Sequence, residues 1–293
     1  MEPEAAWRYL RGISRGLRRG TTFPKESRVP AVAAPGGTRV LDRAPRGTAA
    51  LAAWELVEHR CAFPGLAAPL TVLQLSDVHI RGVDPALRAL CARISTLKAD
   101  LVVLTGDVVT RGWTREATDL FFSALPRAAL GTWAIMGNWE YWAQAPPDTW
   151  RFVLGRHGIT LLLDESAALG PLHLVGTDDA LAGRPDLDRA FAGVPAGTPS
   201  LVLTHSPALF DRIAGPRAPL VLAGHTHGGQ VVLPGLGSFF LPRGSGAYPW
   251  GWYRSGGSHL FVSRGLGWSV APMRVRCPPE IALIQLDPAW FPT

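Results

Sequence analysis

The sequence predicts an α/β protein with more than one β-sheet, and two observations support this prediction. From about residue 70, short apolar runs of strand length alternate with amphipathic stretches of helix length. Further along the chain the pattern changes to mostly strand-like runs, so more than one sheet is expected. The chain has 293 residues, of which 47% are hydrophobic, which excludes a disordered or fibrous protein and allows a sizeable core.

The first expected strand–helix–strand unit has clear local signals. Residues 71–75 and 101–104 are β-branched or leucine-rich runs, which are typical of buried strands. Between them, apolar residues recur at helical spacing from Leu87 to Leu97, directly after Asp84-Pro85, and proline favours the first turn of a helix. The further expected strands are residues 132–135, 160–163, 172–175, 201–203, 220–222, 230–233, 259–262 and 281–285. The further expected helices are residues 114–124, 147–157, 186–192 and 207–213.

The positive charge of the chain belongs to its first fifty residues. The net charge is +6, and residues 1–50 alone hold ten basic and four acidic side chains, an excess of six. Because this basicity lies in a tail and not on a folded face, we expect no nucleic-acid partner. We interpret residues 1–50 as a basic N-terminal extension and linker, and residues 51–293 as one domain of the size of a catalytic domain.

Residues 7–19 of this extension place Trp7, Leu10, Ile13 and Leu17 on one face of a helix, with arginines around them. Such a segment can lie on an anionic membrane surface, and a solvated, frayed terminus is an equal alternative. The three cysteines have no C-x-x-C spacing, which excludes a disulfide framework and fits a reduced compartment. We therefore expect a cytoplasmic protein, with contact to the membrane surface as one of the two alternatives.

Five short polar segments directly follow apolar runs, where open α/β sheets place their functional sites. Each contains a carboxylate, an amide or an imidazole that can bind a metal ion. Asp77 and His79 are two residues apart, as are His225 and His227, so a turn just past the strand can direct both members of a pair toward one centre. The segments are residues 76–79, 105–107, 136–138, 204–206 and 223–229.

These segments offer seven candidate ligands: two carboxylates, one amide oxygen and four imidazoles. Any one of them alone is more often a satisfied buried polar group. Together they are too many for one zinc or iron ion and suit two ions that share a bridging carboxylate. Two such ions acidify a bridging water and favour an anionic substrate such as a phosphate ester. The candidates are Asp77, His79, Asp107, Asn138, His205, His225 and His227.

The same segments resemble the calcineurin-like metallophosphoesterase family, whose motifs run D-x-H, G-D, G-N-H-[DE], a lone His and G-H-x-H. The resemblance covers about residues 70–285. It implies a two-sheet αββα sandwich and two divalent metal ions, which in the family include manganese, iron and zinc. It also implies that one ion is held by Asp77, His79, Asp107 and His227. The other ion would be held by Asp107, Asn138, His205 and His225, with Asp107 bridging.

Three further segments narrow the resemblance to one branch of the family. Residues 175–179, 263–267 and 277–281 look similar to the branch that contains YkuE-type proteins and some UDP-2,3-diacylglucosamine hydrolases. Separately, the anionic substrate expected of two metal ions and the amphipathic residues 7–19 lead us to expect a phosphorylated small molecule or a lipid-linked phosphate as the partner.

Position 139 departs from the family pattern. Trp139 stands where the family motif has the histidine that is credited with protonating the leaving group or with stabilising the transition state. An indole cannot deliver a proton near neutral pH, but a phosphate leaving group departs without this help. We therefore expect a hydrolase of phosphoester or pyrophosphate bonds that uses a metal-bound hydroxide as nucleophile.

Two alternatives to this prediction stay open. In the first, a different residue acts as the acid. In the second, the protein is a metal-binding module of the same fold that has lost catalysis. The candidate acids are His157, His173, His259 and Glu140.

Arginines and tryptophans near the polar segments are candidates for substrate contacts. Arg81, Arg111 and Arg264 can pair with a substrate phosphate. The tryptophans either receive a sugar, a base or an acyl chain, or simply pack loops against the sheets. They are Trp113, Trp139, Trp142, Trp250, Trp252 and Trp268.

Overall fold

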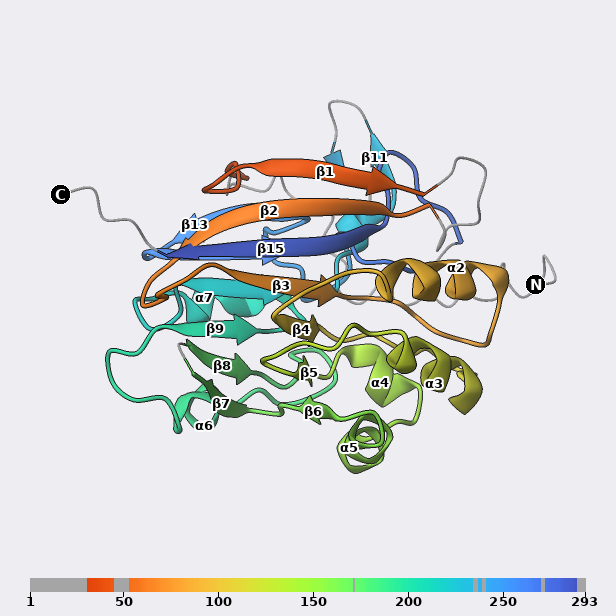
Figure 1. Ribbon diagram of the computed structural model, residues 1–293, viewed down its shortest axis with the longest axis horizontal. Helices are drawn as coiled ribbons and strands as arrows, with labels where there is room; N and C mark the ends of the chain where they lie inside the picture. The colour runs from red at the N-terminus through yellow and green to blue at the C-terminus, as the bar shows by residue number, and fades with distance from the viewer. Residues whose placement is uncertain are drawn as a thin grey trace.

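The structure is a computed structural model and describes residues 31–44, 53–170, 172–233, 237–238, 241–269 and 272–288. Two large mixed β-sheets lie face to face, with helices on their outer faces (Figure 1). The predicted α/β architecture with two sheets is therefore confirmed. The expectations for residues 7–19 lie outside the described residues.

The seven-stranded sheet has the order β1-β2-β15-β3-β4-β5-β6. Its strands are β1 (Thr38–Arg43), β2 (Glu55–Phe63), β3 (Leu70–Leu75), β4 (Leu101–Leu104), β5 (Thr132–Ala134), β6 (Ile159–Leu161) and β15 (Glu280–Pro288). The six-stranded sheet has the order β13-β14-β10-β9-β8-β7. Its strands are β7 (Glu165–Leu169), β8 (Leu172–Gly176), β9 (Ser200–Leu203), β10 (Leu220–Ala223), β13 (Gly251–Ser255) and β14 (Ser258–Val262). A short hairpin pairs β11 (Val232–Leu233) with β12 (Gly237–Ser238).

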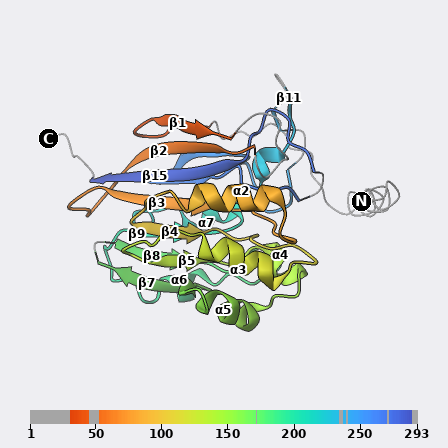
Figure 2. The ribbon, with the colours of Figure 1, turned by 45° about the vertical axis from the view of Figure 1, so that its right-hand side comes forward.

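Three apolar clusters separate four layers: helices, the seven-stranded sheet, the six-stranded sheet and helices. The helices are α2 (Pro85–Ile94), α3 (Arg115–Ser123), α4 (Asn138–Trp142), α5 (Pro147–Gly155), α6 (Leu187–Phe191) and α7 (Phe210–Ile213). Helices α2, α3 and α5 cover the seven-stranded sheet (Figure 2), with Leu90, Phe121 and Trp150 buried against it. Helices α6 and α7 cover the other sheet through Phe191 and Phe210. Between the two sheets, both contribute apolar side chains to one core, for example Val103 from β4 and Leu203 from β9.

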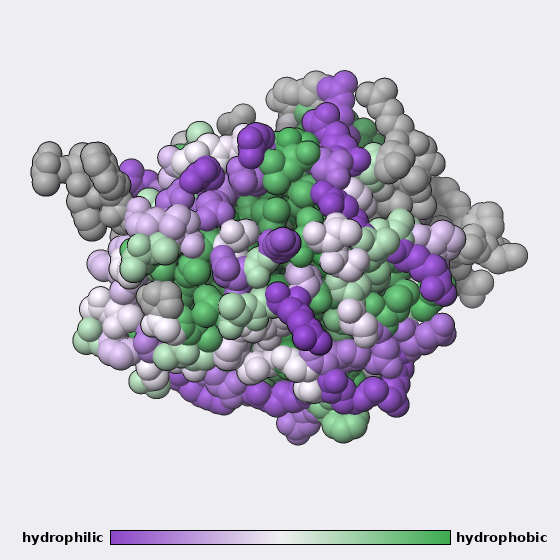
Figure 3. Space-filling model, in the orientation of Figure 1, coloured by the Kyte–Doolittle hydropathy of each residue, from purple (hydrophilic) through white to green (hydrophobic). Residues whose placement is uncertain are grey.

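That central core explains why the buried strands are rich in leucine and valine. Strands β3, β4, β9 and β10 have both faces covered, so they read as continuous apolar runs and not as alternating ones. Burying this surface removes roughly 25 cal/mol of unfavourable hydration per Å². On the face seen in Figure 1, hydrophilic side chains form the lower border and apolar ones appear in patches between polar neighbours (Figure 3).

Residues 38–43, which the sequence places in the linker, instead form β1. They pair antiparallel with β2, so part of the expected linker belongs to the seven-stranded sheet. All six residues of β1 are exposed, and an exposed edge strand carries no alternation of apolar and polar residues by which to recognise it. Strands β2, β7 and β13 also have no counterpart among the expected strands. The expected strand at 230–233 is reduced to the two residues of β11.

None of the helices in the described ranges has the length and apolar composition needed to cross a membrane. Cys61, Cys91 and Cys277 are buried free cysteines.

The strand directions bring the polar segments to one edge of the sandwich. Strands β3, β4 and β5 are parallel neighbours in one sheet, and β9 and β10 are parallel neighbours in the other. Each polar segment follows the carboxyl end of one of these strands. The Gln74 side chain joins the two sheets there, because its amide donates to Thr105 Oγ1 and to the carbonyl of Ala223, both at 3.0 Å.

Candidate metal centre

Two buried groups of ligand side chains lie at this edge. One contains Asp77, His79 and His227, and the other contains Asp107, His205 and His225. Within each group the ligand atoms lie within 4.8 Å of one another. Six of the seven residues predicted from the sequence are therefore brought together from four separate loops.

The first group directs its donor atoms toward one another. The Nε2 atoms of His79 and His227 are 3.0 Å apart, and His227 Nε2 lies 3.4 Å from Asp77 Oδ1. An ion with ligands at 2.0–2.1 Å in tetrahedral geometry separates neighbouring donors by roughly 3.3 Å. The spacing of these three atoms therefore suits a shared cation.

The second group has the same kind of spacing. His205 Nε2 lies 3.2 Å from Asp107 Oδ2 and 3.2 Å from His225 Nδ1. The remaining ring nitrogens have partners outside the group. His205 Nδ1 donates to the Thr105 carbonyl at 2.8 Å, and His225 Nε2 donates to the Arg243 carbonyl. These bonds fix the tautomers that leave His205 Nε2 and His225 Nδ1 with lone pairs for an ion.

Asp107 lies between the two groups. Its Oδ2 atom is 3.2 Å from His205 Nε2 in the second group and 3.8 Å from His79 Nε2 in the first. Its Oδ1 atom accepts a hydrogen bond from the Trp139 backbone N–H at 2.8 Å. One carboxylate oxygen therefore lies close to an imidazole of each group.

Asn138, the seventh predicted residue, opens helix α4 next to Trp139. Its side chain is buried, and its Oδ1 atom has no hydrogen-bond partner among the described residues. A buried amide oxygen without a hydrogen-bond partner lowers the stability of the fold, and coordination to a cation would remove this penalty. The nitrogen and oxygen donors present fit divalent transition-metal ions such as manganese, iron or zinc and do not distinguish among them.

Five of these ligands have left-handed backbone angles, which non-glycine residues rarely adopt. The φ values are 53° at Asp77, 54° at His79, 54° at Asp107, 74° at His225 and 52° at His227. Such strain persists only where the surrounding structure enforces it, and it concentrates at functional sites.

Burial shifts the pKa values of the ligand side chains. Burial, with the neighbouring charges of Glu140 and Asp77, raises the pKa of Asp107 to about 7, although His205 opposes this shift. Burial also lowers the pKa of His79 and of His227 well below the ordinary value for histidine. The Asp107 carboxylate in turn raises the pKa of His205 well above the ordinary value, although burial opposes this shift. Divalent cations bind ionised carboxylates and neutral imidazoles, so His79 and His227 are held in the binding form, whereas Asp107 and His205 would give up protons when an ion binds.

Glu140 supports the loop that carries Asp107. Its buried carboxylate accepts backbone N–H groups from Val108 at 2.7 Å, Gly137 at 2.8 Å and Asp107 at 2.9 Å. A side chain at Gly137 would collide with the Asp107 carboxylate, so only glycine fits there. The Glu140 oxygens are thus committed to the backbone, and Glu140 acts as a positioning residue.

Replacing Glu140 with glutamine should therefore destabilise the protein and loosen the metal centre. The amide keeps one acceptor oxygen but turns an N–H group toward backbone N–H donors, so we expect a loss of about 2 kcal/mol in unfolding free energy. Urea denaturation measures this loss. The matched control is Glu116→Gln, because Glu116 is exposed on α3 and should change stability little. Equal stability of Glu140→Gln and wild type would contradict the assigned role.

The three histidines named as alternative acids lie away from the ligand groups. His157 Nε2 lies 2.8 Å from Asp119 Oδ1, on the helical side of the seven-stranded sheet. His173 and His259 pair in register with Ser200 and Leu220, the first residues of β9 and β10. The ligands follow the opposite ends of those strands, so neither histidine shares the site.

Trp139 lies against the first group. Its ring meets the His79 ring edge-on, with centroids 5.4 Å apart, and it meets Trp142 at 5.5 Å. Of the other predicted aromatic residues, Trp268 lines a cavity with His79, whereas Trp113 packs against Trp150.

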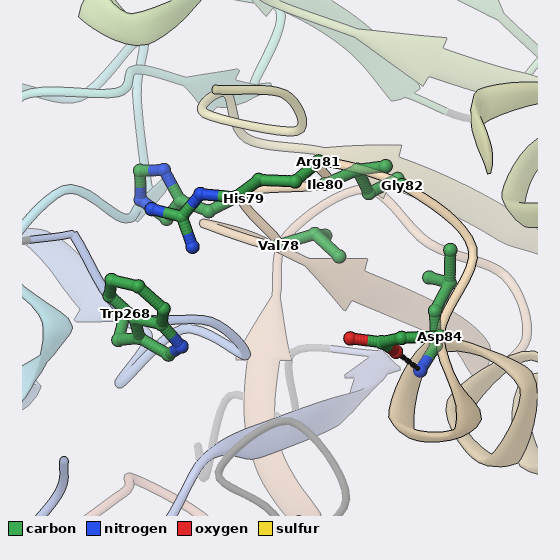
Figure 4. Close-up of a pocket in the computed structure, with 8 residues that line it drawn as sticks. Val78, His79, Ile80, Arg81, Gly82, Asp84 and Trp268 are labelled. Atoms are coloured by element: carbon green, nitrogen blue, oxygen red, sulfur yellow. Dashed lines mark hydrogen bonds between the residues drawn. The ribbon is translucent and has the colours of Figure 1, made fainter. Parts of the chain in front are cut away.

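The three predicted arginines have different surroundings. Arg264 is engaged in ion pairs with Glu280 at 3.3 Å and Glu55 at 3.2 Å. Arg111 is exposed, and its Nε donates to the Trp142 carbonyl at 3.2 Å. Arg81 stacks on Trp268 beside His79 (Figure 4).

The sequence gives no sign of the role of Arg274, because this residue lies in a loop without strand or helix periodicity. Its Nη1 donates to the Arg264 carbonyl at 2.8 Å, and its Nη2 lies 3.2 Å from His227 Nδ1. It also donates to the Gly267 carbonyl. Arg274 thus ties the loops after β10 and β14 together behind His227.

Comparison with known proteins identifies the family. The model of the family described as calcineurin-like phosphoesterase matches residues 70–229. Phosphodiesterase YaeI of Escherichia coli strain K12 is 31% identical over 247 residues, covering 80% of this chain and 88% of YaeI. This chain belongs to the calcineurin-like phosphoesterase family. It is therefore a metal-dependent phosphoester hydrolase by family, as its motifs predict.

Other relatives agree with the predicted branch of the family. The uncharacterized metallophosphoesterase YkuE of Bacillus subtilis strain 168 is 27% identical over 224 residues, covering 73% of this chain and 78% of YkuE. UDP-2,3-diacylglucosamine pyrophosphatase LpxG of Chlamydia trachomatis is 26% identical over 281 residues, covering 74% of this chain and 83% of LpxG.

Proposed function

We propose that this phosphoesterase works with two divalent metal ions and hydrolyses a phosphoester or pyrophosphate whose leaving group needs no proton. The observation that carries the proposal is the position of Asp107 Oδ2, which faces His205 Nε2 at 3.2 Å and His79 Nε2 at 3.8 Å. One carboxylate oxygen directed at both imidazole groups supports a shared, two-ion centre.

The first ion would be held by Asp77, His79, Asp107 and His227. The second ion would be held by Asp107, Asn138, His205 and His225. When bound, two such ions lower the pKa of a water molecule and stabilise charge on the attacked phosphate.

The protein's own residues would hold this centre rigid. The Asp77 carboxylate accepts the Ser76 hydroxyl at 2.6 Å and the His225 backbone N–H at 3.0 Å, so its oxygens are fixed before any ligand binds. Glu140 holds the Asp107 loop from behind. Such preorganisation avoids rearrangement during the reaction and contributes much of the catalytic effect in enzymes.

Trp139 supports the assignment of the leaving group. Its indole has one N–H and no group that titrates near neutral pH, so it cannot act as the general acid at this position. Losing a general acid costs about 10²–10⁴-fold when the leaving group must be protonated. A phosphate or another stable anion as leaving group avoids this cost. The relatives named phosphodiesterase and pyrophosphatase fit such a substrate.

Metal removal tests the proposal. The full chain loaded with manganese should hydrolyse bis(p-nitrophenyl) phosphate, and chelation followed by gel filtration should abolish turnover, because the ions supply the activated water. Adding manganese back should restore it. Protein that retains two ions and turns over neither this diester nor a pyrophosphate would instead favour a metal-binding module, for which the indole at position 139 is the supporting observation.

A further inference from the structure

The loop between β8 and α6, residues 177–186, carries two adjacent buried aspartates, Asp178 and Asp179. Strand β8 is the parallel neighbour of β9, so this loop begins at the same edge of the sandwich as the ligand loops. Its first residues belong to segment 175–179, one of the three that resemble a branch of the family. The loop therefore places two carboxylates beside the metal centre that are not among its predicted ligands.

Asp178 connects this loop to helix α4, which follows β5 of the other sheet. Its Oδ1 atom accepts the Tyr141 hydroxyl at 2.6 Å. Burial, followed by this hydrogen bond and the Asp178 charge, raises the pKa of Tyr141 above its ordinary value, so the hydroxyl stays protonated and donates. Tyr141 lies about one turn after Asn138, the predicted ligand that opens α4. The hydrogen bond between Tyr141 and Asp178 therefore holds the short helix that presents Asn138.

Asp179 connects the same loop to the segment that carries His205. Its Oδ1 atom accepts the hydroxyl of Ser206, the residue after His205, at 3.2 Å. Its Oδ2 atom accepts the backbone N–H groups of Leu181 at 2.8 Å and Ala182 at 2.6 Å. Both carboxylate oxygens thus have partners within the protein, and Asp179 acts on His205 through the neighbouring Ser206 and not as a ligand.

Contacts within the loop fix the position of Asp178. Its Oδ2 atom accepts the Arg184 backbone N–H at 2.7 Å, and its own backbone N–H donates to Asp164 Oδ1 at 2.8 Å. A side chain at Gly183 would collide with the Asp178 carboxylate, so only glycine fits there. The loop is therefore a rigid support, which a positioning role requires.

The ligands of the proposed second ion come from opposite sheets. Asn138 follows β5 of the seven-stranded sheet, whereas His205 follows β9 of the six-stranded sheet. Distances between a metal ion and its ligands vary by only about 0.2 Å, so the separation of these two side chains must be held closely. The loop after β8 contacts both sides of this junction, through Tyr141 and through Ser206.

The charge of Asp179 also reaches the second ligand group. Burial lowers the pKa of His205, but neighbouring carboxylates, led by Asp107 and including Asp179, raise it well above the ordinary value. Burial and the His205 charge lower the pKa of His225 to about 4, and Asp179 is among the groups that oppose this shift. Since Asp107 is the carboxylate of the second group, a further negative charge nearby favours a cation there.

We infer that Asp178 and Asp179 are positioning residues for the second ion: they hold the segments of Asn138 and His205 at the separation that this ion needs, without binding it. The inference rests on the proposed function, because it requires a second ion. Loss of either link should weaken the second ion and spare the first, whose ligand group contains Asp77, His79 and His227.

Two mild variants test the inference, because each removes one hydroxyl and no ligand. They are Tyr141→Phe, on the Asn138 side, and Ser206→Ala, on the His205 side. Equilibrium dialysis of the full chain against manganese measures the affinity of each ion. Each variant should weaken one ion by about 10- to 100-fold, the usual effect of losing an outer-shell hydrogen bond, and leave the other within about twofold. At saturating manganese, turnover of bis(p-nitrophenyl) phosphate should return to within about threefold of wild type, since mass action refills the site.

Tyr253→Phe and Ser200→Ala are the matched controls. Tyr253 is buried, and its hydroxyl donates to the Trp250 carbonyl at 2.9 Å. Ser200 is buried at the start of β9, the strand that leads to His205. Both controls lose a hydroxyl from a buried residue outside the two links, so they should bind both ions as the wild type does.

A ligand variant assigns the affected ion. His225→Ala removes a ligand of the second group and should keep one ion, and adding Ser206→Ala to it should leave the affinity of that ion within about twofold. A loss of about tenfold in the double variant would place the effect on the first ion and overturn the inference. His225→Ala protein without any ion would also overturn it, because the two ions could then not be weakened separately.

The wild-type protein separates failure of the inference from failure of the proposed function. If the wild type holds two ions, equal weakening of both ions, or no weakening in either hydroxyl variant, would overturn the inference alone. Wild-type protein that holds one ion or none would overturn the proposed function as well.

Discussion

Asp107→Asn should abolish catalysis and remove at least one of the two ions. The substitution replaces the oxygen that faces both imidazole groups, or its partner, with an amide nitrogen that cannot bind a cation. It also removes a negative charge from a buried site that must balance two divalent ions. Activation of water and stabilisation of the attacked phosphate both depend on this centre, so kcat/KM should fall by more than about 10³-fold. Steady-state kinetics together with metal analysis measure both effects.

The matched control for this variant is Asp188→Asn. Asp188 is exposed in the first turn of α6 and belongs to neither ligand group, so the change should affect neither metal content nor rate. Asp107→Asn protein that is folded, retains two ions and keeps more than a tenth of wild-type activity would contradict a bridging role for Asp107.

Trp139→His should raise activity on substrates with poor leaving groups. The imidazole would introduce a group that titrates near neutral pH at the position where the family motif has histidine. A restored general acid contributes about 10²–10⁴-fold, and an imperfectly placed one should still give about tenfold or more with an alkyl phosphodiester. Turnover of bis(p-nitrophenyl) phosphate should change little, because p-nitrophenolate leaves without protonation.

The measurement is the ratio of the turnover rate with the alkyl phosphodiester to that with bis(p-nitrophenyl) phosphate. Trp142→His serves as the control, since Trp142 lies on the same short helix and contacts the Trp139 ring, but it is 42% exposed and belongs to neither ligand group. If both tryptophan variants shift the two substrates alike, with metal content intact, position 139 has no part in leaving-group chemistry.

The metal centre could be predicted from sequence because its ligands follow strand ends. Parallel neighbours such as β3 and β4 end at the same edge of a sheet, so Asp77 and Asp107 must come close once the strands are recognised. The sequence patterns do not predict that the second sheet packs next to the first at this edge. This packing depends on side chains such as Gln74, which reaches the Ala223 carbonyl across a separation of 149 residues. The family resemblance supplied that part of the prediction.

The roles of Arg264 and Glu140 show where sequence proximity misleads. Arg264 lies in the segment 263–267, one of those that resemble a branch of the family, and was predicted to contact a phosphate, yet its partner Glu55 lies 209 residues away on β2. Glu140 follows Trp139 and was a candidate acid, yet it is occupied by backbone N–H groups of the Asp107 loop. Ion pairs and loop clamps of this kind depend on tertiary contacts, which neither periodicity nor motif spacing encodes.

Strand β1 illustrates a different limit. Its residues are exposed throughout, and only pairing with β2 defines it as a strand. No apolar pattern distinguishes such an edge strand from a polar linker, because neither of its faces is buried.

Counting the ions per chain tests the two-ion centre most directly. Purified full-length protein, equilibrated with manganese and freed of excess metal, should contain two ions per chain by elemental analysis, and Asp107→Asn should contain one or none. A wild-type content of one ion or none, with the protein folded, would contradict the shared role of Asp107 and the proposed function with it.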